Sequence, residues 1–222
     1  MLEGLVAFPP NRATLGGTAY LLTTAAGNVL VDSPPWTVET QAYLRDRPVR
    51  WFFLTHRNAM AQVKTIQAAL DCEVVVQEQE AYLLPELTVT TFQQEGELTP
   101  GLTALWTPGY SPGSACLYWA GAAAGAAAQP KTTPGGVLFT GRHLLPTPQG
   151  GIAPLRTSKT FHWPRQLRSL AQLQARFSPA QLGWICPGGS IGFLRGDRCL
   201  DQGGQRLQAL DLAALAQAPI GP

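Results

Sequence analysis

One histidine lies where functional side chains are commonly found. The apolar run Trp51–Leu54 is followed by a polar break at Thr55 and His56, and then by residues compatible with a helix. This order is typical of a buried strand that passes into a helix through a loop, and sites are usually built on such loops. An imidazole in that position can bind a metal ion or act as a general base. His56 is therefore the first candidate for chemistry.

The segment that contains His56 resembles a known metal-binding signature. In the metallo-β-lactamase-fold hydrolases, a strand of this kind is followed by Thr-His-x-His-x-Asp-His, and those side chains hold one or two zinc or iron ions. In this chain only the first His is present, at His56. Asn58 stands at the second His, Met60 at the Asp and Ala61 at the last His. The resemblance therefore marks a metal site whose ligands have been replaced.

Three later loops show the same resemblance, each with its metal ligand replaced. The loop at 107–114 resembles the family's Thr-Pro-Gly-His-Thr-Pro-Gly-Ser, but Tyr110 stands at the His. A phenol with a pKa near 10 is a poor zinc ligand at neutral pH. Phe-Thr-Gly-Arg at 139–142 resembles Phe-Thr-Gly-Asp, so Arg142 replaces an acid that bridges two metals. Pro-Gly-Gly at 187–189 resembles Pro-Gly-His, with Gly189 in place of the final ligand.

Asp32 has two possible roles. Leu-Val-Asp-Ser at 30–33 resembles the family's Leu-Ile-Asp-Thr-Gly, whose Asp orients a ligand His by a hydrogen bond. Asp32 could hold His56 in the same way, as carboxylates hold imidazoles around metal sites. Alternatively, Asp32 is a turn residue that precedes Pro34 and Pro35.

The resemblance implies a fold, and the replaced ligands imply a missing cofactor. The fold class is α/β, an αββα four-layer sandwich of two mixed β-sheets flanked by helices, with a site at one edge where the loops meet. We expect a single domain, 1–222, with an Ala/Gly-rich low-complexity loop at about 120–135. A catalytic zinc needs about three protein ligands, and of the family's ligands this chain keeps His56 alone. We therefore expect no metal cofactor, neither zinc nor iron.

The elements that position these residues are predicted from periodicity and turn residues. Asn58 is a good N-cap residue, so we expect a helix from about 58 to 70 with Met60 and Ala61 on its apolar face. The stretch 152–161 has too little periodicity to assign. Further helices are expected at 37–47, 77–84, 164–177 and 205–216, and strands at 5–8, 18–23, 28–31, 50–54, 73–76, 87–91, 102–106, 115–119, 136–140 and 182–186.

Without a metal, hydrolysis by the family mechanism is not expected. A bound metal lowers the pKa of water from 15.7 to about 7, which corresponds to about 12 kcal/mol, whereas a general base contributes only about 10²–10⁴-fold. Arg142 then has two interpretations. Its guanidinium could pair with Asp32 and fill the former pocket. Alternatively, Arg142, His56, Tyr110 and Asn58 form an anion-binding pocket for a phosphate or carboxylate.

The favoured hypothesis is a metal-free, non-hydrolytic protein that binds a protein partner or an anionic small molecule. One alternative is a hydrolase of thioesters or phosphoesters with a rearranged site that depends on His56. Another is RNA binding through a basic second half, because residues 98–196 hold eight Lys or Arg and no acidic residue, whereas 1–97 hold 11 acidic and six basic residues. Basic and aromatic residues are interleaved only at 156–168, so nucleic acid is not the expected partner.

Composition places the chain among globular proteins of a reducing compartment. Its 222 residues are 45% apolar and carry a net charge of +2. The chain has no apolar run of about 18 residues and no basic, hydrophobic leader, so we expect no membrane span. Its four cysteines are far apart in the sequence and form no Cys-x-x-Cys pair, which predicts free, mostly buried thiols and a cytoplasmic location.

Overall fold

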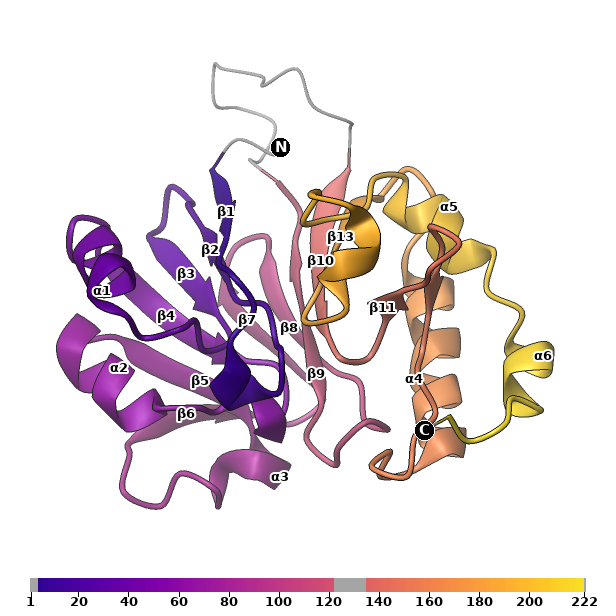
Figure 1. Ribbon diagram of the computed structural model, residues 1–222, viewed down its shortest axis with the longest axis horizontal. Helices are drawn as coiled ribbons and strands as arrows, with labels where there is room; N and C mark the ends of the chain where they lie inside the picture. Colours follow the sequence, from indigo (N-terminus) through magenta and orange to yellow (C-terminus); the bar gives the residue numbers. More distant parts are fainter. Residues whose placement is uncertain (1–3, 122–134, 222) are drawn as a thin grey trace.

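Two mixed β-sheets pack face to face, and helices cover their outer surfaces (Figure 1). The computed structural model describes residues 4–121 and 135–221. Among these, no helix is long and apolar enough to cross a membrane. The α/β class and the αββα arrangement predicted from the sequence are confirmed.

The first sheet holds the N-terminal strands in the order β1-β2-β3-β4-β5-β6. Strands β1 to β3 pair antiparallel, and β3 to β6 pair parallel through helical connections. The strands are β1 (Leu5–Ala7), β2 (Tyr20–Leu22), β3 (Asn28–Val31), β4 (Val49–Leu54), β5 (Glu73–Gln77) and β6 (Val89–Phe92), and the helices are α1 (Val38–Arg45), α2 (Val63–Leu70) and α3 (Glu78–Ala81), with short 3₁₀ helices at Arg12–Thr14 and Arg57–Ala59.

The second sheet has the order β13-β10-β9-β8-β7, with β13 parallel to β10 and the other pairs antiparallel. Its strands are β7 (Glu95–Thr99), β8 (Leu102–Trp106), β9 (Ala115–Trp119), β10 (Gly136–Gly141) and β13 (Leu182–Pro187). The remaining elements are the two-stranded ribbon β11 (Leu145–Pro146) and β12 (Ile152–Ala153), a 3₁₀ helix at Ile191–Leu194, and the helices α4 (Trp163–Arg176), α5 (Gly203–Gln208) and α6 (Leu212–Ala216).

Strand β4 shows how one apolar run builds two layers of core. Because side chains alternate along a strand, Trp51 and Phe53 face the second sheet, whereas Phe52 and Leu54 pack in the layer that contains residues of α1 and α2. All four side chains are at most 3% exposed. A strand buried on both faces leaves its functional residues to the loop that follows, which is where His56 lies.

Several boundary predictions are confirmed and others are wrong. Strands 102–106 and 115–119 have the predicted bounds, but β7 was missed because Glu-Gly-Glu-Leu-Thr is mostly polar. The helix predicted at 58–70 begins only at Val63, after Gln62 adopts a left-handed conformation with φ of 56°. Asn58 therefore lies in a 3₁₀ turn and caps no α-helix, and Met60 and Ala61 lie between the two elements.

Two further predictions concern the second half of the chain. The helix predicted at 205–216 is two helices, because Asp211 adopts an extended conformation and caps the start of α6. The low-complexity loop predicted at about 120–135 falls largely outside the described residues. The strands on either side of it, β9 and β10, pair antiparallel.

Candidate functional site

Loops that follow β4, β8, β10 and β13 meet at one edge of the sheets. The amide of Ala115 donates to the carbonyl of Thr55 (2.8 Å), and that of Gly188 donates to the carbonyl of Gly141 (2.7 Å). A Cβ at Gly141, whose φ is 50°, would lie 2.3 Å from Thr55 Oγ1. The close approach of the Thr55 side chain to this backbone, together with the positive φ, therefore requires glycine at this position.

His56 is buried at the centre of this edge and is uncharged. The residue is 3% exposed. Neither ring nitrogen has a hydrogen-bond partner among residues 4–121 and 135–221. Its ring centroid lies 4.9 Å from that of Tyr110. Burial, and secondarily the charge of Arg142, lower the pKa of His56 to about 3. The imidazole is therefore neutral at neutral pH.

Asp32 pairs with Thr55 and not with His56. Its carboxylate accepts hydrogen bonds from the Thr55 amide (2.8 Å) and the Thr55 hydroxyl (2.7 Å to Oδ2). Burial raises the pKa of Asp32 to about 7 although these bonds oppose the shift. Of the two roles considered for Asp32, the hydrogen bond to His56 is not formed, because Thr55, the residue before His56, donates to the carboxylate.

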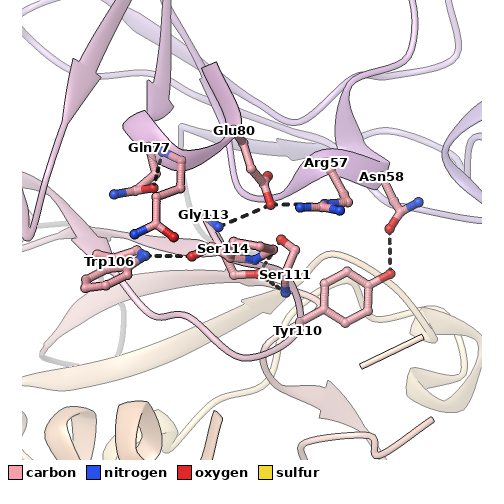
Figure 2. A network of polar contacts seen from close by, with 11 residues as sticks. Arg57, Asn58, Gln77, Glu80, Trp106, Tyr110, Ser111, Gly113 and Ser114 are labelled. Atoms are coloured by element: carbon pink, nitrogen blue, oxygen red, sulfur yellow. Dashed lines mark hydrogen bonds and ion pairs between the residues drawn. The ribbon is translucent and has the colours of Figure 1, made fainter. Parts of the chain in front are cut away.

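The loop that carries Tyr110 is held by hydrogen bonds of its own, shown in Figure 2. The Ser111 amide donates to Ser114 Oγ (2.8 Å), and Trp106 Nε1 donates to the carbonyl of Pro112 (2.9 Å). The Tyr110 hydroxyl donates to Asn58 Oδ1 at 2.9 Å (Figure 2). Tyr110 and Asn58, which stand where the family pattern has metal-binding histidines, are thus hydrogen-bonded to each other.

A buried acid that sequence analysis missed supports the same loop. Glu80 is fully buried, and its Oε1 accepts from Arg57 Nε and from the Gly113 amide, both at 3.3 Å (Figure 2). These bonds connect α3, the turn after His56 and the Tyr110 loop. Glu80 lies in an expected helix without any motif, so no sequence signal distinguishes it from a surface acid.

Arg142 does not pair with Asp32. Its Nη2 donates to the carbonyls of Thr14 (3.1 Å) and Leu15 (2.6 Å), and its guanidinium carbon lies 6.0 Å from the Tyr110 ring centroid. Its Nε is buried and has no hydrogen-bond partner in the part of the chain that the structure describes. The interpretation that Arg142 fills the pocket by an ion pair with Asp32 is therefore wrong.

Arg142 and Tyr110 border a hollow of about 280 Å³. Lys159 contributes a second cation, and Thr157 and Ser158 contribute hydroxyl groups. Leu145 and Leu155 supply apolar surface. Among the described residues, none that lines the hollow is acidic. Sequence analysis missed Lys159 because the stretch 152–161 could not be assigned, and in the structure it follows the short strand β12.

The other predicted positions divide between this edge and the core. Gly189 is buried, and a Cβ there would lie 3.6 Å from Leu145, one of the residues that line the hollow. Met60 packs against the core layer behind the first sheet and borders a separate hollow with residues 83–87. Ala61, the residue after Met60, is half-buried. The structure thus brings together His56, Asn58, Tyr110 and Arg142, with Gly189 near them.

The residues at this edge do not fit a metal ion. Among the described residues, no three His, Cys, Asp or Glu side chains lie close enough to hold one. His143, next to Arg142, is 1% exposed, and burial lowers its pKa to about 3. Three protein ligands and an open position are the usual requirement for catalytic zinc. That the protein uses no zinc or iron stays a prediction.

The two packed sheets and the edge where the loops meet define the metallo-β-lactamase fold. The BLEG-1 B3 metallo-β-lactamase is similar with 17% identity and a TM-score of 0.62, over 90% of this chain and 95% of that one. An N-acyl homoserine lactone hydrolase, with its product bound at the catalytic metal centre, has 18% identity and a TM-score of 0.60 over 87% and 96%. A metallo-β-lactamase family protein from Thermus thermophilus has 19% identity and a TM-score of 0.64 over 97% and 80%.

These likenesses are structural. No protein-family model matches the sequence, and no curated protein matches it. At identities below 20% the three structures show the fold of this chain and leave its chemistry to its own residues.

Proposed function

We propose that this protein binds a small anionic molecule in the hollow between Arg142 and Lys159, and that it does not carry out metal-dependent hydrolysis. The observation that carries the proposal concerns Arg142: the residue lines an open hollow, and its buried Nε has no partner among the described residues. Buried donors are nearly always hydrogen-bonded in native proteins. A phosphate or carboxylate group can supply the acceptor.

The lining of the hollow favours an anion attached to a small apolar body. A guanidinium presents donors in a planar fork that matches carboxylate and phosphate oxygens, and Lys159 adds a second positive charge. The side chains of Leu145 and Leu155 and the Tyr110 ring offer apolar contact at the same place. A hollow of about 280 Å³ suits a ligand of this kind, at the lower end of usual small-molecule sites.

The position of His56 is unsuited to hydrolysis in this hollow. A general base must come within about 2.6–3.2 Å of the proton that it takes, directly or through one water. His56 is 3% exposed, lies behind Tyr110 and does not line the hollow. Even a well-placed base contributes only about 10²–10⁴-fold, which is small beside the roughly 12 kcal/mol of water activation that a metal supplies.

The test is isothermal titration calorimetry of the purified protein with phenyl phosphate and with benzoate. We expect saturable binding of at least one of them. Hydrogen bonds to a charged group contribute about 1.5–3 kcal/mol, so Arg142→Gln should weaken binding by about 10- to 100-fold. The matched control is Lys64→Gln. It removes one positive charge from an exposed ion pair with Glu86, and Lys64 does not line the hollow, so binding should be unchanged.

Three outcomes would contradict the proposal. The first is no binding of either probe, or binding that Arg142→Gln leaves intact. The second is release of phosphate from phenyl phosphate, or of acid from generic thioesters, that disappears in His56→Gln. The third is near-stoichiometric zinc, iron or manganese in protein purified without chelator, measured by mass spectrometry. The last two would favour the hydrolase alternative.

A further inference from the structure

Two cysteines that are far apart in the sequence lie opposite each other in the structure. Ile185 in β13 and Leu200 exchange both backbone hydrogen bonds, at 2.9 Å each, and form an antiparallel bridge. Cys186 follows Ile185 and Cys199 precedes Leu200, so the two cysteines lie opposite each other one position beyond the bridge. Both are free thiols.

The geometry of this position suits a disulfide bond. In antiparallel pairing, a hydrogen-bonded pair is followed by a pair without hydrogen bonds, whose Cα atoms lie about 4.5 Å apart and whose side chains point to the same face. Disulfides join Cα atoms about 4.4–6.8 Å apart. Cys186 and Cys199 occupy such a pair, and Cys199 packs against the core cluster that contains Cys186.

Tyr20 holds the two segments in this register. The residue after Cys186 is Pro187, which has no N–H and so cannot donate to the carbonyl of Arg198 across the pair. The buried hydroxyl of Tyr20 lies 2.7 Å from that carbonyl and 2.8 Å from the carbonyl of Pro187. The phenol therefore replaces the missing backbone donor and fixes the two cysteines opposite each other.

The two thiols differ in access in the way that stepwise exchange requires. Cys199 is partly exposed and borders a hollow of about 700 Å³, lined also by Trp184, Phe193, Arg195 and Arg198. The neighbouring Cys186 thiol lowers the pKa of Cys199, although burial opposes this, whereas burial raises the pKa of Cys186. Cys186 is 1% exposed. The attacking thiolate is thus Cys199, and Cys186 is the resolving thiol.

We propose that Cys186 and Cys199 form a reversible redox pair that reacts with a low-molecular-weight disulfide, R–S–S–R, in this hollow. The Cys199 thiolate attacks one sulfur, the S–S bond of the small disulfide breaks, and RS⁻ leaves. Cys186 then loses its thiol proton and attacks the Cys199 sulfur, which releases a second RS⁻ and closes the Cys186–Cys199 disulfide. Two protein thiols are oxidised, and one small disulfide is reduced to two thiols.

The test uses the reduced full-length protein and glutathione disulfide, with thiols alkylated under denaturing conditions and counted by mass spectrometry. We expect two of the four thiols to disappear, the peptides of Cys186 and Cys199 to be joined, and dithiothreitol to restore all four. The Cys186→Ser variant should stop at one glutathionyl group on Cys199. The Cys199→Ser variant should form neither the disulfide nor an adduct. Cys72→Ala is the matched control and should still form the bond.

Several results would overturn the inference. These are four thiols left free after incubation, a bond that involves Cys72 or Cys116, a stable glutathionyl adduct on Cys199 in the unmodified protein, or an adduct on Cys186 in Cys199→Ser. The measurement on the unmodified protein needs no substitution, so it stays decisive even if a variant fails to fold. The pair is separate from the Arg142 hollow, so neither proposal depends on the other.

Discussion

The buried titratable groups at the site predict how the stability of the protein varies with pH. In the folded protein the pKa values of His56 and His143 are each about 3, lowered chiefly by burial from 6.5, and that of Asp32 is about 7, raised by burial from 3.8. At about pH 5–6 the unfolded chain therefore binds two protons on these groups and the folded protein binds one, on Asp32. Because the unfolded state binds more protons, the free energy of unfolding should rise with pH in this window.

Two substitutions separate the contributions of the histidines and of Asp32 to this pH dependence. One proton of difference corresponds to about 1.4 kcal/mol per pH unit. In His143→Leu the unfolded chain loses one of its two bound protons, so the contribution of these groups to the slope should fall to about zero. In Asp32→Asn the folded protein loses its opposing proton, so the slope should double to about 2.7 kcal/mol per pH unit. The two variants thus move the slope in opposite directions.

Urea unfolding at several pH values between about 5 and 6, at constant ionic strength, measures these slopes. Lys64→Gln is the control, because it changes charge at an exposed site. Equal slopes in the unmodified protein and both variants, or a flatter slope in Asp32→Asn, would refute the assignment of a neutral His143 and a protonated Asp32. A flat slope in the unmodified protein that His143→Leu leaves unchanged would refute the assignment of a neutral His143.

Three further predictions concern packing and covalent state. Tyr110→Phe removes the hydroxyl that donates to Asn58 and should cost about 1 kcal/mol, or about 2–4 °C in Tm, measured by thermal unfolding. Gly109→Ala should destabilise by about 3 kcal/mol or more, because a Cβ there would lie 2.3 Å from Gln166 Cα at a φ of 150°; urea unfolding tests this. Oxidation of the Cys186–Cys199 pair closes a short loop and should raise the free energy of unfolding by up to about 3 kcal/mol, seen as a higher Tm that dithiothreitol reverses.

The fold could be predicted because its loops resemble, in residue type and order, those of the metallo-β-lactamase fold. The two Pro-Gly pairs at 107–114 and the Phe-Thr-Gly at 139–141 constrain the backbone wherever they occur. The strands on either side of the first loop were accordingly predicted with their observed bounds. The start of α2 was not, because Gln62 adopts a left-handed conformation that its residue type does not announce.

The partners of the site residues could not be predicted, because they depend on groups that any sequence contains. One of the two roles considered for Asp32 was to hold the His56 imidazole, but its carboxylate accepts from the hydroxyl and the amide of Thr55. One of the two interpretations of Arg142 paired it with Asp32, but it donates to backbone carbonyls 128 and 127 positions away. Every residue has a carbonyl, so no pattern marks the ones that a guanidinium will choose.

Among the described residues, the buried polar atoms without partners extend beyond Arg142. Buried polar side chains in native proteins nearly always have partners, and each exception calls for an explanation. Within the described residues, the buried side-chain atoms without partners include both ring nitrogens of His56 and of His143, Nε of Arg142 and Oε1 of Gln166. Gln166 donates to the backbone carbonyl of His143, the residue that follows Arg142. A fold that had only lost its metal would gain stability by filling this edge with apolar residues. Of these atoms, Nε of Arg142 is a donor on a residue that lines the hollow, which is bordered by two cations and, among the described residues, by no acid, so Arg142 is the group with which an anionic ligand would pair.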